Sequence, residues 1–218
     1  MELNRYIDHT LLKPTATERD IIDLCNDAKK YKFFSVCINS CYIPLAKQLL
    51  KGSSVKICTV VGFPLGATAT ETKVFEAQQA IEAGAQEIDM VINIGFLKSK
   101  NYLEVFKDIS DVKLAIGKTT LKVILEISEL SKNDIVKACE ICLDAKADFV
   151  KTSTGFSKSG ATLTAVKIMK KTVKDQAKIK ASGGIGDFET AQKYIDIGVD
   201  RIGTSKGVNI VNEQLSEA

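Results

Sequence analysis

The fold is decided by the stretch Ala147-Asp148-Phe149-Val150-Lys151-Thr152-Ser153-Thr154-Gly155. It contains a short apolar strand that ends in a lysine and leads at once into a small, polar turn. A helix end and a tight turn come before the strand, and the same order recurs at 83–89 and at 197–203. Recurring helix–turn–strand units predict an alternating α/β architecture.

The whole chain repeats this alternation eight times. Strands are expected at 6–10, 33–38, 55–61, 86–92, 121–127, 148–152, 177–181 and 199–203. Helices are expected at 17–31, 41–51, 70–83, 98–117, 131–146, 162–175 and 187–197, with a last one from about 205. Eight such units in 218 residues predict one domain, 1–218, folded as a single (β/α)8 TIM barrel. A doubly wound parallel sheet is the structural alternative, because the pattern alone does not close a sheet.

Composition narrows the classes of partner. The net charge is only +3 and the basic residues are scattered along helices, which disfavours nucleic acid and membrane surfaces as partners. The first residues are polar, and no segment approaches the roughly 18 consecutive apolar residues of a membrane span, so we expect a cytoplasmic protein. Cys139 and Cys142 form a C-x-x-C, but they lie inside a helical pattern without a second pair, which favours free thiols.

Charged residues occur near the carboxyl ends of five expected strands, each beside mostly apolar neighbours: Asp8, Asp89, Glu126, Lys151 and Lys180. Since alternate strand residues face opposite sides, these side chains are expected to point into the barrel, with Glu126 as a third acid in the set. Active sites of such barrels lie at that end. The alternative is a buried ion-pair network without chemistry, although burying so many charges is costly.

Two of these residues, Lys151 and Lys180, indicate carbonyl chemistry. A buried lysine near a second ammonium tends to lose its proton, and a neutral lysine attacks carbonyls to form a Schiff base. The pattern alone does not choose between Lys151 and Lys180.

Glycine-rich loops indicate a bound phosphate. Gly183 and Gly184 follow the seventh strand, and Gly203-Thr204-Ser205 follows the eighth just before a helix. This is the common phosphate position of the barrel fold. His9, the only histidine, could act as a general base, but its place beside Asp8 on a short strand favours a structural hydrogen bond.

Four segments taken together resemble the deoxyribose-phosphate aldolase family: Tyr6-Ile7-Asp8-His9-Thr10-Leu11-Leu12-Lys13-Pro14, Glu87-Ile88-Asp89-Met90-Val91-Ile92-Asn93, Phe149-Val150-Lys151-Thr152-Ser153-Thr154-Gly155 and Lys180-Ala181-Ser182-Gly183-Gly184-Ile185. Val36-Cys37-Ile38-Asn39 and Arg201-Ile202-Gly203-Thr204-Ser205 are also similar. The match covers nearly the whole chain in the family's order.

The resemblance implies a class I aldolase that reversibly cleaves 2-deoxy-D-ribose 5-phosphate to acetaldehyde and D-glyceraldehyde 3-phosphate, with no metal and no cofactor. It implies that Lys151 forms the Schiff base, that Lys180 favours the neutral form of Lys151, and that Asp89 transfers protons with a water. Asp8 would hold Lys180, and Cys37 matches a position that lines the pocket. Phosphate would lie on Gly155, Gly183, Gly184, Gly203 and Ser205. Family members are often dimers or larger, which implies a homo-oligomer, a dimer or a tetramer.

The chain departs from the family at two positions. Gly186 stands where the family usually carries an arginine, and Lys206 replaces a serine after strand eight. Our hypothesis is that Lys206 supplies the positive charge that is missing at position 186. Without such compensation, phosphate binding would be weaker.

Three alternatives to this function remain open at the level of sequence. A related Schiff-base lyase, such as a transaldolase-like barrel, would act on another sugar phosphate. A non-catalytic sugar-phosphate-binding barrel would use its lysines only as anion ligands. A purely structural set of charges would bind no ligand at all.

Overall fold

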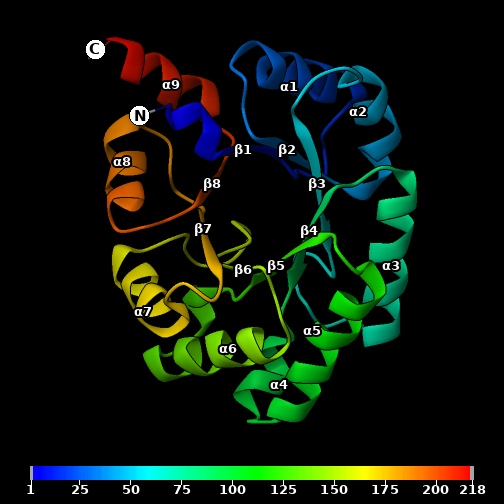
Figure 1. Cartoon of the computed structure of the whole chain (residues 1–218), viewed down its shortest axis with the longest axis vertical. Helices are drawn as coiled ribbons and strands as arrows, with labels where there is room; N and C mark the ends of the chain where they lie inside the picture. Colours follow the sequence, from blue (N-terminus) through cyan, green and yellow to red (C-terminus); the bar gives the residue numbers. More distant parts are fainter. Residues whose placement is uncertain (1, 217–218) are drawn as a thin grey trace.

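The computed structural model, which describes residues 2–216, contains eight parallel strands closed into a barrel (Figure 1). The strands follow one another around the barrel in chain order, and β8 pairs with β1. This pairing confirms the TIM barrel and excludes the doubly wound sheet, whose edges stay open. All eight strands were predicted, and they are β1 Ile7–Leu11, β2 Ser35–Ile38, β3 Lys56–Val61, β4 Glu87–Val91, β5 Thr120–Ile124, β6 Phe149–Lys151, β7 Lys178–Ser182 and β8 Arg201–Thr204.

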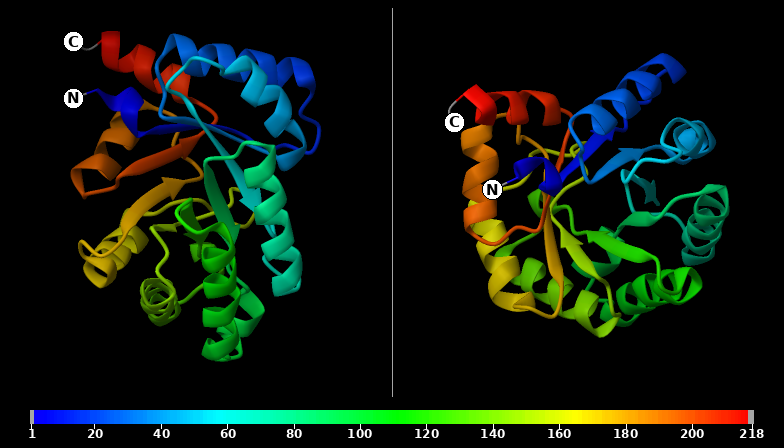
Figure 2. Two further views of the ribbon diagram at one scale, coloured as in Figure 1. Left: turned by 45° about the vertical axis from the view of Figure 1, so that its right-hand side comes forward. Right: turned by 45° about the horizontal axis from the view of Figure 1, so that its top comes forward.

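Helices form an outer layer around the strands in every view (Figure 2). They are α1 Glu18–Lys30, α2 Ile43–Leu49, α3 Thr70–Ala83, α4 Ile94–Lys98, α5 Tyr102–Ile116, α6 Lys132–Asp144, α7 Leu163–Val173, α8 Phe188–Asp196 and α9 Gly207–Ser216. Short 3-10 turns cover η1 Leu3–Tyr6, η2 Ser40–Tyr42 and η3 Ile127–Glu129. Within residues 2–216, no helix is long and apolar enough to cross a bilayer.

The prediction of one helix over 98–117 is wrong at its amino-terminal end. Two helices, α4 and α5, occupy this region, and Lys100 between them has a φ of +58°. A left-handed residue cannot continue an α-helix, so the chain breaks there.

Helix boundaries follow local sequence. Thr17 and Ser131 begin α1 and α6 with capping boxes, in which Asp20 and Asp134 bond back to the capping residue. Gly84 and Gly198 lie just after helices with positive φ, and Lys146 also has a positive φ although it carries a side chain. All three helix–turn–strand copies therefore pass through a residue of positive φ between helix and strand.

The apolar core lies between the barrel and its helices. Ile88, Val150, Ile179 and Ile202 alternate with the charged strand residues and are fully buried in this layer. Their neighbours along each strand consequently face the barrel interior. The helix α9 packs on η1 and β1, so the two ends of the described chain lie side by side (Figures 1 and 2).

Candidate active site

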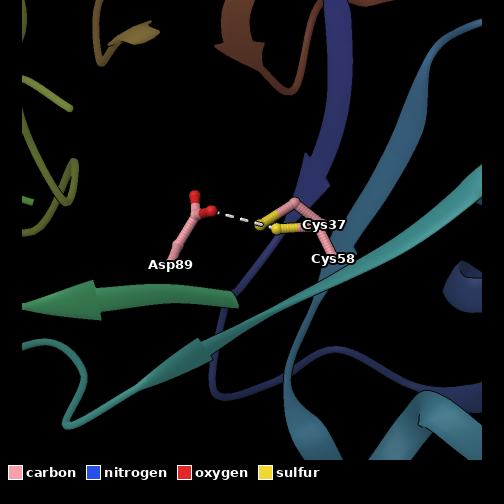
Figure 3. A group of neighbouring side chains, drawn as sticks. All are labelled: Cys37, Cys58 and Asp89. Atoms are coloured by element: carbon pink, nitrogen blue, oxygen red, sulfur yellow. Dashed lines mark hydrogen bonds between the residues drawn. The ribbon is translucent and has the colours of Figure 1, made fainter. Parts of the chain in front are cut away.

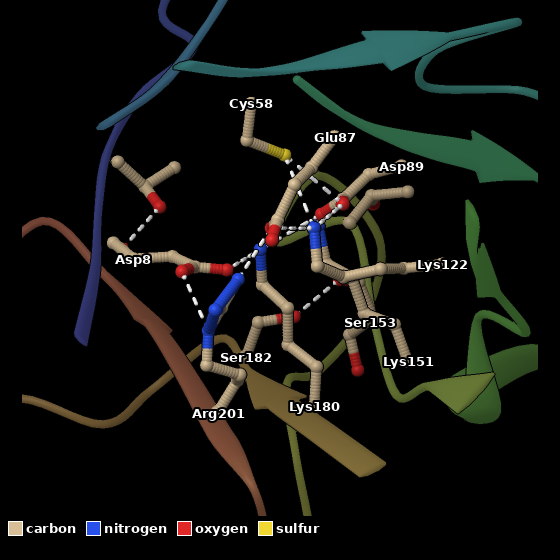
Figure 4. A network of polar contacts seen from close by, with 12 residues as sticks. Asp8, Cys58, Glu87, Asp89, Lys122, Lys151, Ser153, Lys180, Ser182 and Arg201 are labelled. Carbon is tan, nitrogen blue, oxygen red and sulfur yellow. Dashed lines mark hydrogen bonds and ion pairs between the residues drawn. The ribbon is translucent and has the colours of Figure 1, made fainter. Parts of the chain in front are cut away.

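Asp89 lies at the centre of a buried ion network inside the barrel (Figure 4). Its Oδ2 atom is 2.8 Å from the Nζ atom of Lys151 and 2.8 Å from that of Lys180, and its Oδ1 atom is 2.9 Å from Nζ of Lys122. Burial opposes ionisation of Asp89, but Lys122, Lys151 and Lys180 outweigh it and hold the pKa of its carboxyl well below the usual value. Asp89 is therefore a carboxylate shared among three amines.

Asp8 joins the network from the first strand. Its Oδ2 atom is 2.6 Å from Nζ of Lys180, and its Oδ1 atom accepts hydrogen bonds from Arg201 Nε at 3.1 Å and from Ser35 Oγ at 2.6 Å. Burial raises the pKa of Asp8, but Lys180 and Arg201 outweigh burial and lower this pKa to about 2. Burial likewise disfavours the charged form of Lys180, yet Asp8 and Asp89 raise the pKa of Lys180 well above its ordinary value. Lys180 is thus held as an ammonium.

Three members of the network were not predicted from sequence: Glu87, Lys122 and Arg201. Lys122 Nζ lies 2.6 Å from Oε2 of Glu87, and Nη2 of Arg201 donates to the same carboxylate oxygen. These residues share the inward face with Asp89, Lys151 and Lys180, since Glu87 precedes Asp89 by two positions. A search for a second charged residue two positions before each of the charged residues already singled out would have found Glu87.

The network contains more cations than anions. Asp8, Glu87 and Asp89 are its three carboxylates, and all seven residues of the network are at most 3% exposed. The four cations are Lys122, Lys151, Lys180 and Arg201.

A cavity of about 580 Å³ opens beside Lys151 at the carboxyl ends of the strands. Lys151 lies in its wall, whereas Lys180 does not. The cavity is also lined by all six predicted phosphate-site residues, which are Gly155, Gly183, Gly184, Gly203, Ser205 and Lys206. The Lys151 amine and the glycine-rich loops, which are far apart in the sequence, therefore line the same cavity.

Backbone shape makes the far wall of this cavity suitable for an anion. Gly183 and Gly184 have φ values of +87° and +79°, a region that only glycine enters easily. Gly160 also packs closely here, because a Cβ atom on it would lie 2.1 Å from the carbonyl oxygen of Gly183. The amino terminus of α9 follows Lys206, and helix amino termini favour negative charge. Lys13 adds a second exposed cation to the wall.

Glu126 does not join the lysine cluster, which corrects the expectation of a third acid. The strand β5 ends at Ile124, and Glu126 has a φ of +57°, so the alternation of faces is lost before this residue. Its carboxylate accepts instead from the backbone N–H of Thr154, 3.3 Å from Oε2, and from the Thr154 hydroxyl.

Two further sequence candidates lie away from the cavity. His9 faces outward from β1, with its ring centroid 5.0 Å from that of Phe33 and its Nε2 atom 3.9 Å from Asp27 Oδ2, and its Nδ1 atom has no hydrogen-bond partner. Cys37 is fully buried under Leu12, beside Cys58, and does not form part of the cavity wall. The resemblance implies that Cys37 lines the pocket, but in this structure Leu12 lines the cavity and Cys37 packs against Leu12.

Cys37, Cys58 and Asp89 form the group of potential metal ligands found among residues 2–216 (Figure 3). Their ligand atoms lie within 4.8 Å of one another, and Cys58 Sγ donates to Asp89 Oδ1 at 3.1 Å. Both oxygens of Asp89 already accept from lysine amines. These sulfur atoms are better explained as part of the ion network than as metal ligands. All six cysteines are free thiols, which confirms the prediction for Cys139 and Cys142; five are buried and Cys41 is exposed.

Comparison with known proteins agrees with this geometry. The sequence model of the DeoC/LacD family aldolases matches residues 4–212. The deoxyribose-phosphate aldolase of Finegoldia magna is 58% identical over 97% of this chain and 99% of its own. That of Mannheimia succiniciproducens is 57% identical over 96% of this chain and 94% of its own. The chain is an aldolase, and within that class it belongs to the DeoC/LacD family.

Solved structures show the same likeness. The tetrameric deoxyribose-phosphate aldolase of Aeropyrum pernix superposes with a TM-score of 0.91 at 35% identity, covering 99% of this chain and 92% of its own. An aldolase designated QR15 reaches a TM-score of 0.95 at 41% identity, covering 99% and 96%.

Proposed function

We propose that this aldolase reversibly cleaves 2-deoxy-D-ribose 5-phosphate to D-glyceraldehyde 3-phosphate and acetaldehyde through a Schiff base on Lys151. The observation that carries the proposal is the cavity in which Lys151 faces the glycine loops after β7 and β8. An amine at one end and an anion cradle at the other match an open-chain sugar with an aldehyde at C1 and a phosphate at C5. The names of the relatives support this substrate.

The choice between the two lysines rests on their surroundings. Lys151 contacts one carboxylate and reaches the cavity, whereas Lys180 contacts two carboxylates and lies below it. A lysine bound by two carboxylates keeps its proton and is a poor nucleophile. We therefore assign the Schiff base to Lys151, and the charge that favours its neutral form to Lys180.

The proposed reaction starts when neutral Lys151 attacks C1, and the adduct then takes up one proton and loses water, which gives an iminium ion. A base removes the proton of the C3 hydroxyl, the C2–C3 bond breaks, and its electrons pass into the iminium to form an enamine. Glyceraldehyde 3-phosphate departs, C2 is protonated, and water releases acetaldehyde from Lys151. In this proposal Asp89 relays these protons with a water, a role supported by its contacts with both lysine amines. Asp8 holds Lys180 in position.

Borohydride trapping tests the proposal directly. The enzyme is incubated with 2-deoxyribose 5-phosphate and reductant, and intact mass and peptide mapping locate the adduct. We expect a reduced adduct on Lys151. An adduct on Lys180 would reverse the two assignments, and a protein that binds the sugar without any adduct would be a binding barrel instead. A different sugar phosphate trapped more efficiently would favour the transaldolase-like alternative.

We also propose that the chain acts as a cytoplasmic homo-oligomer, a dimer or a tetramer. The tetrameric Aeropyrum pernix structure and the enzymatic names of the relatives support this proposal. Light scattering after size exclusion distinguishes these states from a monomer.

A further inference from the structure

Lys122 has no part in the proposed reaction, although it is fully buried among charged groups in the barrel (Figure 4). Its Nζ atom lies 2.6 Å from Glu87 Oε2 and 2.9 Å from Asp89 Oδ1, and it also donates to Cys58 Sγ at 3.4 Å. It does not line the cavity, so a direct contact with substrate does not explain it. Burying an ammonium here is costly unless its charge matters.

The charge balance of the network points to a purpose for Lys122. With three carboxylates and four cations, the fully ionised network has one positive charge in excess. Like charges repel strongly in a buried site, and the repulsion disappears when one lysine releases its proton. The excess charge therefore favours a neutral amine somewhere in the network.

The partners of each cation show which amine releases the proton. Lys122 and Lys180 each contact two carboxylates, and Arg201 also contacts two and keeps its proton in proteins. Despite their burial, the carboxylates raise the pKa of both Lys122 and Lys180. Lys151 contacts Asp89 alone and lies at the cavity. Lys151 is therefore the cation of the network with the fewest carboxylate partners.

We propose that Lys122 is a positioning residue whose buried charge keeps Lys151 neutral, and thereby sets the lower pH limit of Schiff-base formation. This inference rests on the proposed function and deepens it. The other titratable and charged groups around the amine come from every side of the barrel: Asp8, Cys37, Lys56, Cys58, Glu87, Asp89, Glu126, Lys180 and Arg201, with Lys13 and Lys206 in the cavity wall. All of them except Glu87 are unchanged in the variants compared below.

Removing the charge of Lys122 and removing the charge of Glu87 should shift the pH of Schiff-base formation in opposite directions. Lys122→Met removes one cation, so the network balances with Lys151 protonated, and Schiff-base formation should begin at higher pH by about one unit. Glu87→Gln removes one carboxylate, increases the excess positive charge and should move the onset to lower pH. The double variant Lys122→Met/Glu87→Gln restores an excess of one charge and should return close to the wild type. Lys122→Arg, which keeps the charge, should leave the onset unchanged.

The experiment measures the rate of reductive trapping of 2-deoxyribose 5-phosphate on Lys151 over a series of pH values, for the wild type and the four variants. Circular dichroism first establishes which variants are folded. Below the wild-type onset, Lys122→Met should trap roughly tenfold more slowly, a difference that corresponds to a shift of about one pH unit. If Lys122→Met does not fold, the shift of Glu87→Gln to lower pH still decides the case.

The outcomes separate the two proposals. Opposite shifts in the two single variants, with recovery in the double variant, support the role of Lys122. A wild-type adduct on Lys151 whose pH onset is unmoved in the variants, or moves the same way in both, would overturn that role and leave the aldolase reaction standing. No adduct on Lys151 in the wild type at any pH would overturn both.

Discussion

At the scale of single residues, the proposal that Lys206 supplies the charge missing at position 186 can be tested directly. It lies in the cavity wall, and a Cβ atom on Gly186 would be 3.7 Å from its Cγ atom. Lys206→Ala should therefore raise KM for 2-deoxyribose 5-phosphate by roughly tenfold with little change in kcat, because it removes a charge-assisted contact to phosphate. Steady-state kinetics with the phosphorylated sugar checks this.

The unphosphorylated sugar is the matched control for Lys206. Its KM should be the same in the wild type and in Lys206→Ala, and Lys206→Arg should keep the wild-type KM for the phosphorylated sugar. An unchanged KM for 2-deoxyribose 5-phosphate in Lys206→Ala would show that Lys206 does not take the place of the missing arginine.

Four residues of the site could be predicted from sequence because each is a charged residue among apolar neighbours near the end of a strand. They are Lys151, Lys180, Asp89 and Asp8, and the structure brings all four together. Lys122 stands third of five residues in its strand and not at the strand end, so its position does not distinguish it. Its burial arises only because β4 supplies Asp89 opposite it in the sheet register.

At the scale of elements, the loop after β5 holds the loop after β6. The backbone N–H of Phe156 donates to the Thr154 hydroxyl at 3.0 Å, and that hydroxyl donates to Glu126. Farther out, Ser157 Oγ donates to Glu129 Oε1 at 2.6 Å. Gly155, which lines the cavity, lies between these anchors. The shape of the proposed phosphate site at Gly155 thus depends on Glu126, which does not line the cavity.

Thr154→Val should break this connection. It leaves Glu126, which is 3% exposed, without its hydroxyl donor, and should lower the free energy of unfolding by about 1–3 kcal/mol. Hydrogen exchange at Phe156 should become faster. Thr154→Ser keeps the hydroxyl, so both quantities should stay near wild type in that variant. Equal behaviour of the two variants in denaturant unfolding and hydrogen exchange would contradict the connection.

The elements themselves were largely predictable, and their ends were less so. Periodicity and capping residues such as Thr17 mark each unit, because they act within a few residues. Glu126, Lys146 and Lys100 adopt left-handed backbone, which sequence does not announce in residues with side chains. After β5, the backbone N–H of Ile127 donates to the carbonyl oxygen of Thr152, so a contact far along the chain holds the turn at Glu126. The turn at Lys100 before α5 is closed by local hydrogen bonds, from Lys100 N–H to Leu97 and from Asn101 N–H to Phe96.

At the scale of the whole molecule, His9 links stability to pH. Burial, partly offset by Asp27, lowers the pKa of His9 from 6.5 to about 4. Between these values the unfolded chain binds a proton that the folded chain does not, so stability rises with pH across this window and falls on acidification. The full effect of this residue is about 3 kcal/mol.

Chemical denaturation at neutral pH and near pH 4 checks the role of His9. The wild type should lose more stability on acidification than His9→Gln, and the difference between the two proteins is the measured quantity, since other titrating groups cancel. Equal losses in both proteins would mean that His9 binds protons alike in the folded and unfolded states.

The ion pairs between Asp8 and β8 have a consequence for protein synthesis. Asp8 emerges early from the ribosome, but Arg201 follows 193 residues later. Until then, a nascent barrel would have to enclose the carboxylates of Asp8 and Glu87 without their guanidinium partner, which strongly disfavours closure. A chain released before its last strand should therefore stay open and be recognised by cellular proteases, so that premature termination yields no half-functional enzyme.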